Sequence, residues 1–408
     1  MAEQVSSQDY DCLVLSGGGA KGAYGAGVAK AVDALRRLRG VARPMLYVGA
    51  SAGALNAYIL ASGNADGLIE FWRRLHAQDI LGAESSSAKR RAFLRWASRW
   101  LRPGQPYSVF DNVALRRLVA SEAKLDHLHS DLVIAATDYT RGQARAFFRS
   151  PLIEEFIAED WPQIPRRRRL GHLRSLDTDS QLVDALVSSA AIPVIFPPVQ
   201  ITSSGPDGPE TSWFIDGGVG NNTPTREAAY FTRFLTESGR GRMINAYCVK
   251  LDPPAPVQDG DKSLDLIAII QRTMDVYSWI HMKPIVDGWN RINREVEDQN
   301  QKVSEVTKWL EELPLDPDAR SRISDRIRAD FTKLGGRKPR VSVPLIEIGP
   351  SVPLGDMLDF SPAKAEQHIR HGYNDALDVF RNRQDPATPG ETLLDEAEHT
   401  SLGNRPLW

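Results

Sequence analysis

The chain has 408 residues, of which 42% are hydrophobic, and a formal net charge of −2 at pH 7. This length and composition allow a buried core in one large domain or two. A nearly neutral chain produces no overall field that attracts nucleic acid, so we expect no nucleic-acid partner. The two cysteines, Cys12 and Cys248, lie in apolar runs, which indicates small buried side chains and no disulfide framework.

Neither end of the chain resembles a membrane segment. Residues 1–9 are polar and lack the basic and apolar regions of a Sec signal peptide. No apolar run approaches the ~20 residues that span a bilayer. We therefore expect a cytoplasmic protein whose membrane contact, if any, is peripheral. Residues 1–9 are expected to be a flexible N-terminus, and the polar stretch 384–408 a disordered tail.

The first half of the chain alternates apolar runs with helical patterns. A strand expected over 12–15 precedes a helix over 23–39, and a strand over 45–48 precedes a helix that reaches about residue 62. This order predicts an α/β fold with a mostly parallel central sheet flanked by helices. Later strands are expected over 132–136, 213–215, 244–249 and 341–348, and helices over 71–76, 115–123, 182–190 and 362–381.

Two stretches do not follow this alternation. Residues 84–105 look inserted, and 264–335 form a helical region by periodicity, with Pro284 expected to break the helix. Both lie within the single domain that we expect over residues 10–383. The sequence does not indicate the oligomeric state.

Ser51 stands in the motif Gly49-Ala50-Ser51-Ala52-Gly53, directly after the second apolar run. Glycines on both sides permit a sharp strand-to-helix turn that lifts one hydroxyl clear of the sheet. The motif therefore predicts that Ser51 is a nucleophile.

A glycine-rich loop, Ser-Gly-Gly-Gly-Ala-Lys-Gly over residues 16–22, follows the first strand. Gly17, Gly19 and Gly22 fit the dinucleotide pattern G-x-G-x-x-G, but no acidic residue ends the second strand, and the P-loop pattern is absent. An oxyanion hole and a tight turn without a ligand remain as interpretations. The nucleophile motif in the neighbouring turn favours the oxyanion hole.

Asp216 is the carboxylate best placed to activate Ser51. It follows the apolar run 213–215 and precedes Gly217-Gly218, which leave room for another group close by. An Asx-turn that simply ends the strand is the alternative. Because a carboxylate of pKa ~3.9 is a weak base for a hydroxyl, a Ser–Asp dyad requires a dry site that raises this pKa.

These motifs together resemble the patatin-like phospholipase family. Residues 17–22 match its glycine-rich motif, 49–53 its nucleophile motif and 216–218 its D-G-[GA] motif. Residues 188–197 are similar to the family's Ala-Pro-Phe-Pro stretch. The resemblance extends from about residue 10 to residue 224.

The resemblance implies a three-layer α/β fold, catalysis without a metal or cofactor, and hydrolysis of acyl esters in phospholipids or lysophospholipids. It assigns Ser51 as the nucleophile and Asp216 as the base, with Gly18 and Gly19 as backbone donors to the oxyanion. By the geometry of a nucleophile turn, the N–H of Ala52 joins these donors. The remaining motif glycines are Gly17, Gly22, Gly49, Gly53, Gly217 and Gly218.

Two other functions stay open. One is a Ser-His-Asp triad esterase, although none of the eight histidines lies in a loop just beyond a late strand. The other is a non-catalytic lipid-binding or signalling protein on a hydrolase scaffold. The head group, the acyl chain and the choice between hydrolysis and acyl transfer cannot be read from these motifs.

The insertion 84–105 has a basic amphipathic pattern that suits a lid or a contact with an anionic bilayer. A helix packed on the body with a solvated arginine face is the alternative. The candidate membrane residues are Phe93, Trp96 and Trp100 on the apolar side and Arg95 and Arg99 on the basic side.

Overall fold

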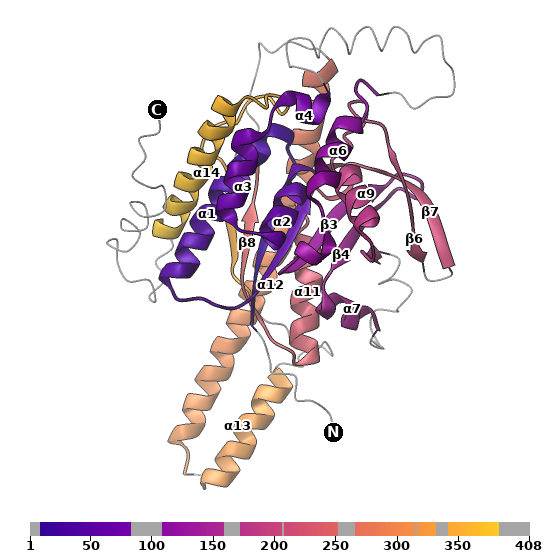
Figure 1. Cartoon of the computed structure of the whole chain (residues 1–408). Helices are drawn as coiled ribbons and strands as arrows, with labels where there is room; N and C mark the ends of the chain where they lie inside the picture. Colours follow the sequence, from indigo (N-terminus) through magenta and orange to yellow (C-terminus); the bar gives the residue numbers. More distant parts are fainter. Residues whose placement is uncertain are drawn as a thin grey trace.

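In the computed structural model, described over residues 9–82, 108–158, 172–205, 208–251, 266–314, 316–331 and 342–382, a mixed sheet lies between two layers of helices (Figure 1). Across the described strands its order is β5-β4-β3-β2-β1-β8-β9. Its parallel centre consists of β1 (Tyr10–Leu15), β2 (Met45–Ala50), β3 (Asp131–Asp138), β8 (Met243–Val249) and β9 (Leu345–Ile348). The mostly parallel α/β fold expected from the sequence is therefore confirmed.

Antiparallel strands border the parallel centre on one side. β4 (Gln143–Arg149) pairs antiparallel with β3, and β5 (Leu173–Ser175) pairs parallel with β4. The hairpin of β6 (Val199–Gly205) and β7 (Gly208–Ile215) joins the end of β3 through Thr137↔Ile215 and Asp138↔Phe214. This junction brings the residue after β7, Asp216, to the carboxyl edge of the parallel strands.

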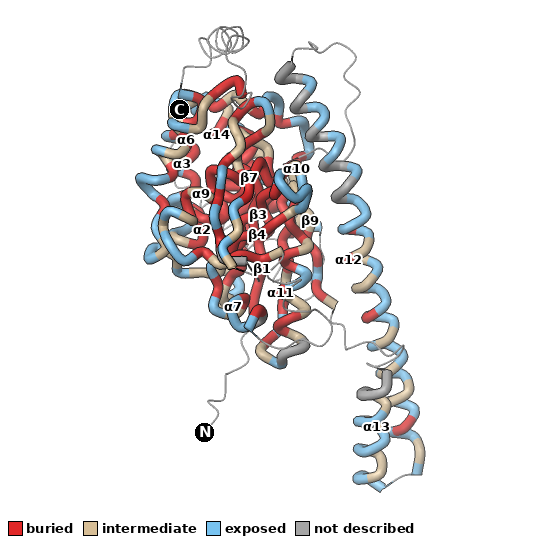
Figure 2. Tube along the Cα trace, turned by 90° about the vertical axis from the view of Figure 1, so that its right-hand side faces the viewer, coloured by how far each residue is buried: buried red, intermediate tan, exposed pale blue. Residues whose placement is uncertain are grey.

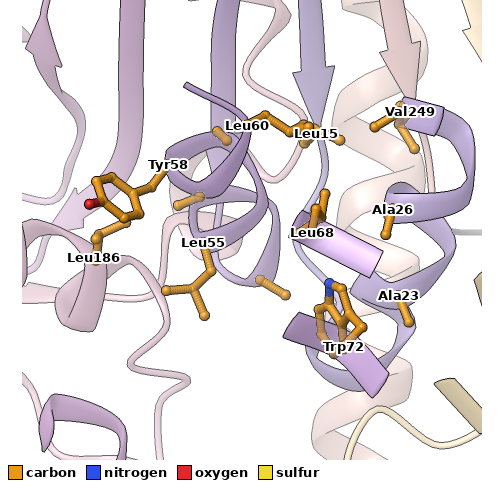
Figure 3. Packing of buried hydrophobic residues seen from close by; sticks show 14 of the residues in the cluster. Leu15, Ala23, Ala26, Leu55, Tyr58, Leu60, Leu68, Trp72, Leu186 and Val249 are labelled. Atoms are coloured by element: carbon orange, nitrogen blue, oxygen red, sulfur yellow. The ribbon is translucent and has the colours of Figure 1, made fainter. Parts of the chain in front are cut away.

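Each face of the sheet has its own apolar core, because alternate residues of a strand point to opposite faces. Leu13 and Leu15 of β1 belong to one core, and Cys12 and Val14 to the other. Figure 3 shows the first core around α2. This core is covered by α1 (Gly22–Leu38), α2 (Ala52–Ser62), α3 (Ala65–Arg74), α4 (Ala77–Leu81), α6 (Val113–Glu122), α9 (Asp179–Ser189) and α14 (Pro362–Asn382).

The second core lies under α7 (Pro151–Ala158), α11 (Thr225–Ser238) and part of α12 (Leu266–Glu312). The far half of α12 and α13 (Pro317–Phe331) extend away from the body with mostly exposed and intermediate residues, as Figure 2 shows. Cys12 and Cys248 are both buried and free, as expected.

The first and last of the described α-helices, α1 and α14, pack backbone against backbone. A Cβ added to Gly27 of α1 would lie 1.9 Å from the carbonyl oxygen of Ile369, and one added to Gly372 of α14 would lie 2.0 Å from that of Tyr24. Only glycine permits this approach. The contact fixes the C-terminal helix directly behind the helix that follows the glycine-rich loop.

The expected break at Pro284 is wrong, because α12 continues through this residue. Pro284 lacks the N–H that would bond the carbonyl of Ile280. Both residues are exposed, so water is available to that carbonyl. The late strand is also shorter than expected and begins at Leu345.

No described helix combines the length and the apolar character that crossing a bilayer requires. The expectations for residues 1–8, for the insertion 84–105 with its aromatic and arginine side chains, and for the tail 384–408 lie outside the described residues.

Candidate active site

The turn between β2 and α2 places Ser51 in a strained backbone conformation, with φ 54° and ψ −128°. Such a conformation favours glycine and costs a serine about 1–3 kcal/mol. The flanking glycines make the turn possible: a Cβ at Gly49 would lie 2.1 Å from the carbonyl oxygen of Gly53, and a Cβ at Gly53 would lie 2.2 Å from that of Leu15. Crowding in this turn therefore requires glycine two residues before Ser51 and two residues after it.

The glycine-rich loop lies against Ser51. A Cβ added to Gly17 would be 2.7 Å from the Cβ of Ser51, and one added to Gly22 would be 2.9 Å from the Cβ of Ala52. Gly19 has φ 58° and begins the short 3-10 helix η1 (Gly19–Lys21). The absence of a Cβ at Gly17 and Gly22 therefore lets the loop approach the nucleophile turn closely.

Several backbone N–H groups of these two turns have no partner in the described structure. Gly17 N–H donates to the carbonyl oxygen of Asn222 at 3.2 Å. No described residue accepts a hydrogen bond from the N–H of Gly18, Gly19 or Ala52. Unpaired N–H groups at helix starts carry partial positive charge, so this corner can stabilise a developing anion.

Asp216 is the N-cap of α10 (Gly217–Asn221) and is 0% exposed. Its Oδ1 accepts a hydrogen bond from Gly218 N–H at 2.7 Å. Its Oδ2 is buried and accepts no fully formed hydrogen bond from the described residues. The Asx-turn and a role toward Ser51 are thus compatible, because they use different oxygens.

Burial raises the pKa of the Asp216 carboxyl group to about 7. The neighbouring Ser51 hydroxyl and the Gly218 N–H both lower this pKa in part. The carboxylate therefore has the basicity that an ordinary aspartate lacks.

The acid turn is fixed against the end of β3. Asp216 N–H donates to the carbonyl oxygen of Ala191 at 2.9 Å, and Thr137 Oγ1 donates to the carbonyl oxygen of Asp216 at 2.8 Å. A Cβ on Gly217 would lie 2.3 Å from the carbonyl oxygen of Ala135 and 3.2 Å from the Cβ of Ala50. Glycine after the acid therefore lets it approach the nucleophile strand.

The structure thus brings together Ser51, Asp216 and the glycine-rich loop. Sequence reasoning missed the residues that hold them. Asn222 bonds the loop, and Ser189 Oγ accepts a hydrogen bond from Ser51 N–H at 2.9 Å. The only signal for Ser189 was its place in the stretch before the acid.

The histidines with described side chains make no hydrogen bond to Ser51 or Asp216. His172 Nε2 lies 2.9 Å from Glu227 Oε1. His368 is buried, which lowers its pKa, and its Nε2 lies 2.7 Å from the carbonyl oxygen of Leu354. In the described part of the chain, no three His, Cys, Asp or Glu side chains could hold a metal ion.

The crystal structure of VipD from Legionella pneumophila is similar at 14% identity and a TM-score of 0.34, covering 92% of this chain and 67% of VipD. A likeness of that size is too weak to support an inference. No curated protein sequence matches. The family model described as "Patatin-like phospholipase" matches residues 13–229, which is more than half of the chain and includes both Ser51 and Asp216. The chain therefore belongs to the patatin-like phospholipase family.

Proposed function

We propose that the protein hydrolyses carboxylic ester bonds of phospholipids or lysophospholipids through an acyl-enzyme on Ser51. The family supports a lipid acyl hydrolase. One observation carries the rest: a strained serine lies beside a fully buried carboxyl group that has one uncommitted oxygen. This arrangement supplies a nucleophile and a base in a water-poor site.

In the first half of the reaction, Asp216 takes the hydroxyl proton as Ser51 Oγ forms a bond to the ester carbonyl carbon. The N–H groups of Gly18, Gly19 and Ala52 donate to the carbonyl oxygen as it becomes negative. When the intermediate collapses, the ester C–O bond breaks and the leaving alcohol receives the proton from Asp216. The acyl group then remains on Ser51.

In the second half, Asp216 takes a proton from water while the water oxygen attacks the acyl carbon. The same N–H groups stabilise the second oxyanion. The bond to Ser51 Oγ breaks, and the serine oxygen recovers the proton from Asp216. A carboxyl group with a pKa of about 7 suits both directions of transfer at neutral pH.

The proposal is tested by incubating the purified chain with a panel of phospholipids and lysophospholipids and measuring released fatty acid. We expect release from at least one lipid, and covalent labelling of the protein by a fluorophosphonate. A protein that neither releases fatty acid nor reacts with the probe would contradict hydrolysis. If the probe labels the protein and no fatty acid is released, but the acyl group is transferred to an added alcohol, the protein is an acyltransferase.

The pH dependence should reveal the buried base. The reaction needs ionised Asp216, so kcat/KM falls as pH drops below about 7, by about tenfold per pH unit. A soluble short-chain ester measured over about pH 5 to 9 checks this, with circular dichroism to exclude unfolding. If kcat/KM is half of its maximum near pH ~4, the pKa of an ordinary aspartate, the base does not have the raised pKa proposed for Asp216.

A further inference from the structure

We propose that Ser189 is a positioning residue that holds the backbone of Ser51 in its strained turn and so keeps the Ser51 hydroxyl in position beside Asp216. The proposal rests on the proposed function and adds a residue that neither the nucleophile motif nor the acid motif contains. Ser189 is the last residue of α9 and is 0% exposed, so water does not compete for its hydroxyl.

The Ser189 hydroxyl links β3 to the turn that follows β2. It donates its single proton to the carbonyl oxygen of Ala135 in β3 at 2.6 Å. Its oxygen is then free to accept from Ser51 N–H at 2.9 Å. Because a carbonyl oxygen only accepts and an N–H only donates, the direction of both hydrogen bonds is fixed.

The Ser51 N–H depends on this hydroxyl. At the start of a helix, the first N–H groups have no carbonyl partner within the helix. Ser51 is 3% exposed, so solvent does not replace the missing partner. Removing the Ser189 hydroxyl leaves a buried donor unsatisfied at the point where the chain is already strained.

The same short segment also holds the acid. Ala191, two residues after Ser189, accepts a hydrogen bond from Asp216 N–H at 2.9 Å. The carbonyl oxygen of Ala135 that receives the Ser189 proton is the one against which Gly217 packs, 2.3 Å from where a Cβ would lie. Residues 189–191 therefore set the position of the nucleophile turn relative to the acid turn.

The neighbouring Ser188 provides a matched control. It is also 0% exposed, and its Oγ donates to the carbonyl oxygen of Ala185 at 2.9 Å, one turn back in its own helix. Ser188→Ala removes a buried hydroxyl of the same size without touching Ser51 or Asp216. Any general cost of losing a serine at the end of α9 appears in both variants.

The experiment compares Ser189→Ala, Ser188→Ala and wild type on a soluble short-chain ester, below the melting temperature of each variant. We expect Ser189→Ala to lower kcat by about 10²-fold with KM changed by less than about twofold, since misplacement of reacting groups acts on the chemical step. Ser188→Ala keeps kcat within about twofold of wild type. Ser189→Thr, which restores the hydroxyl, recovers part of the lost kcat.

A second measurement reports on the hydrogen bond from Ser51 N–H to Ser189 Oγ directly. Amide hydrogen exchange at Ser51 is slow in wild type and in Ser188→Ala, and at least about tenfold faster in Ser189→Ala. Equal kcat in the two alanine variants, or unchanged exchange at Ser51, overturns the proposal. If wild type hydrolyses no ester, the proposed function fails, and the exchange rates alone then decide whether Ser189 holds the Ser51 backbone.

Discussion

Ser51→Ala abolishes ester hydrolysis, with a loss of at least about 10³-fold in kcat, and eliminates labelling by a fluorophosphonate. The reason is that Ser51 supplies the attacking oxygen in the proposed reaction, whereas the nearby hydroxyls of Ser189 and Thr137 donate to backbone carbonyl oxygens. Turnover of the lipid panel and intact-protein mass after probe treatment measure the two effects. Retained turnover in this variant would show that the acyl-enzyme does not form on Ser51.

Ser51→Gly is the companion variant, because it separates catalysis from strain. It is as inactive as Ser51→Ala, but glycine adopts φ 54° and ψ −128° freely, whereas alanine keeps the penalty. We expect the glycine variant to be more stable than the alanine variant by about 1 kcal/mol, measured by denaturant unfolding. Equal stability would mean that the turn is not held against a backbone preference.

Asp216→Asn lowers kcat by about 10³- to 10⁴-fold, because the amide cannot take the Ser51 proton. The amide oxygen still accepts from Gly218 N–H, so the acid turn is preserved. Measurement of kcat on a soluble ester tests the loss. A variant with near wild-type kcat would exclude Asp216 as the base and reopen the search among the histidines.

The same variant is expected to be more stable than wild type at neutral and alkaline pH. Asp216 has a pKa of about 7 in the fold, raised by burial from the ordinary aspartate value of 3.8. Between these two values the folded state binds a proton that the unfolded state has released, so stability falls as pH rises through this window. The penalty reaches at most about 4 kcal/mol above the folded pKa.

Thermal unfolding at several pH values checks the sign of this effect. Asp216→Asn should melt above wild type at about pH 8, and the difference should shrink as pH is lowered toward 5. A difference that grows on acidification would contradict a burial-raised pKa. Loss of activity together with a gain in stability marks a group retained for chemistry rather than for the fold.

The motifs were readable from the sequence because crowding allows only glycine at several of their positions. Gly49, Gly53 and Gly217 each face a carbonyl oxygen where a Cβ would stand. These contacts require glycine at fixed positions of the motifs, and such glycines can be recognised in a single sequence. The positions of Ser51 and of the parallel strands around it followed from the same pattern.

The remaining features depend on contacts between distant segments. The mixed composition of β4 (Gln143–Arg149) gave no strand signal, and its pairing with β3 is settled by packing. Ser189 looks like any serine at the end of a helix until the fold brings Ser51 and Ala135 to its hydroxyl. The raised pKa of Asp216 likewise arises from burial that no local pattern encodes.

The glycine-rich turn near the start of the chain is completed by residues near its end. Ala20 N–H donates to the carbonyl oxygen of Met357 at 2.8 Å, and His368 fixes the loop that carries Met357 by its contact with Leu354. A growing polypeptide on the ribosome has already produced Ser51 and Asp216 before this support exists. A chain that stops before Met357 lacks this acceptor for the N–H of Ala20, so the proposed cleavage is expected to need the segment that carries Met357 as well as the two motifs.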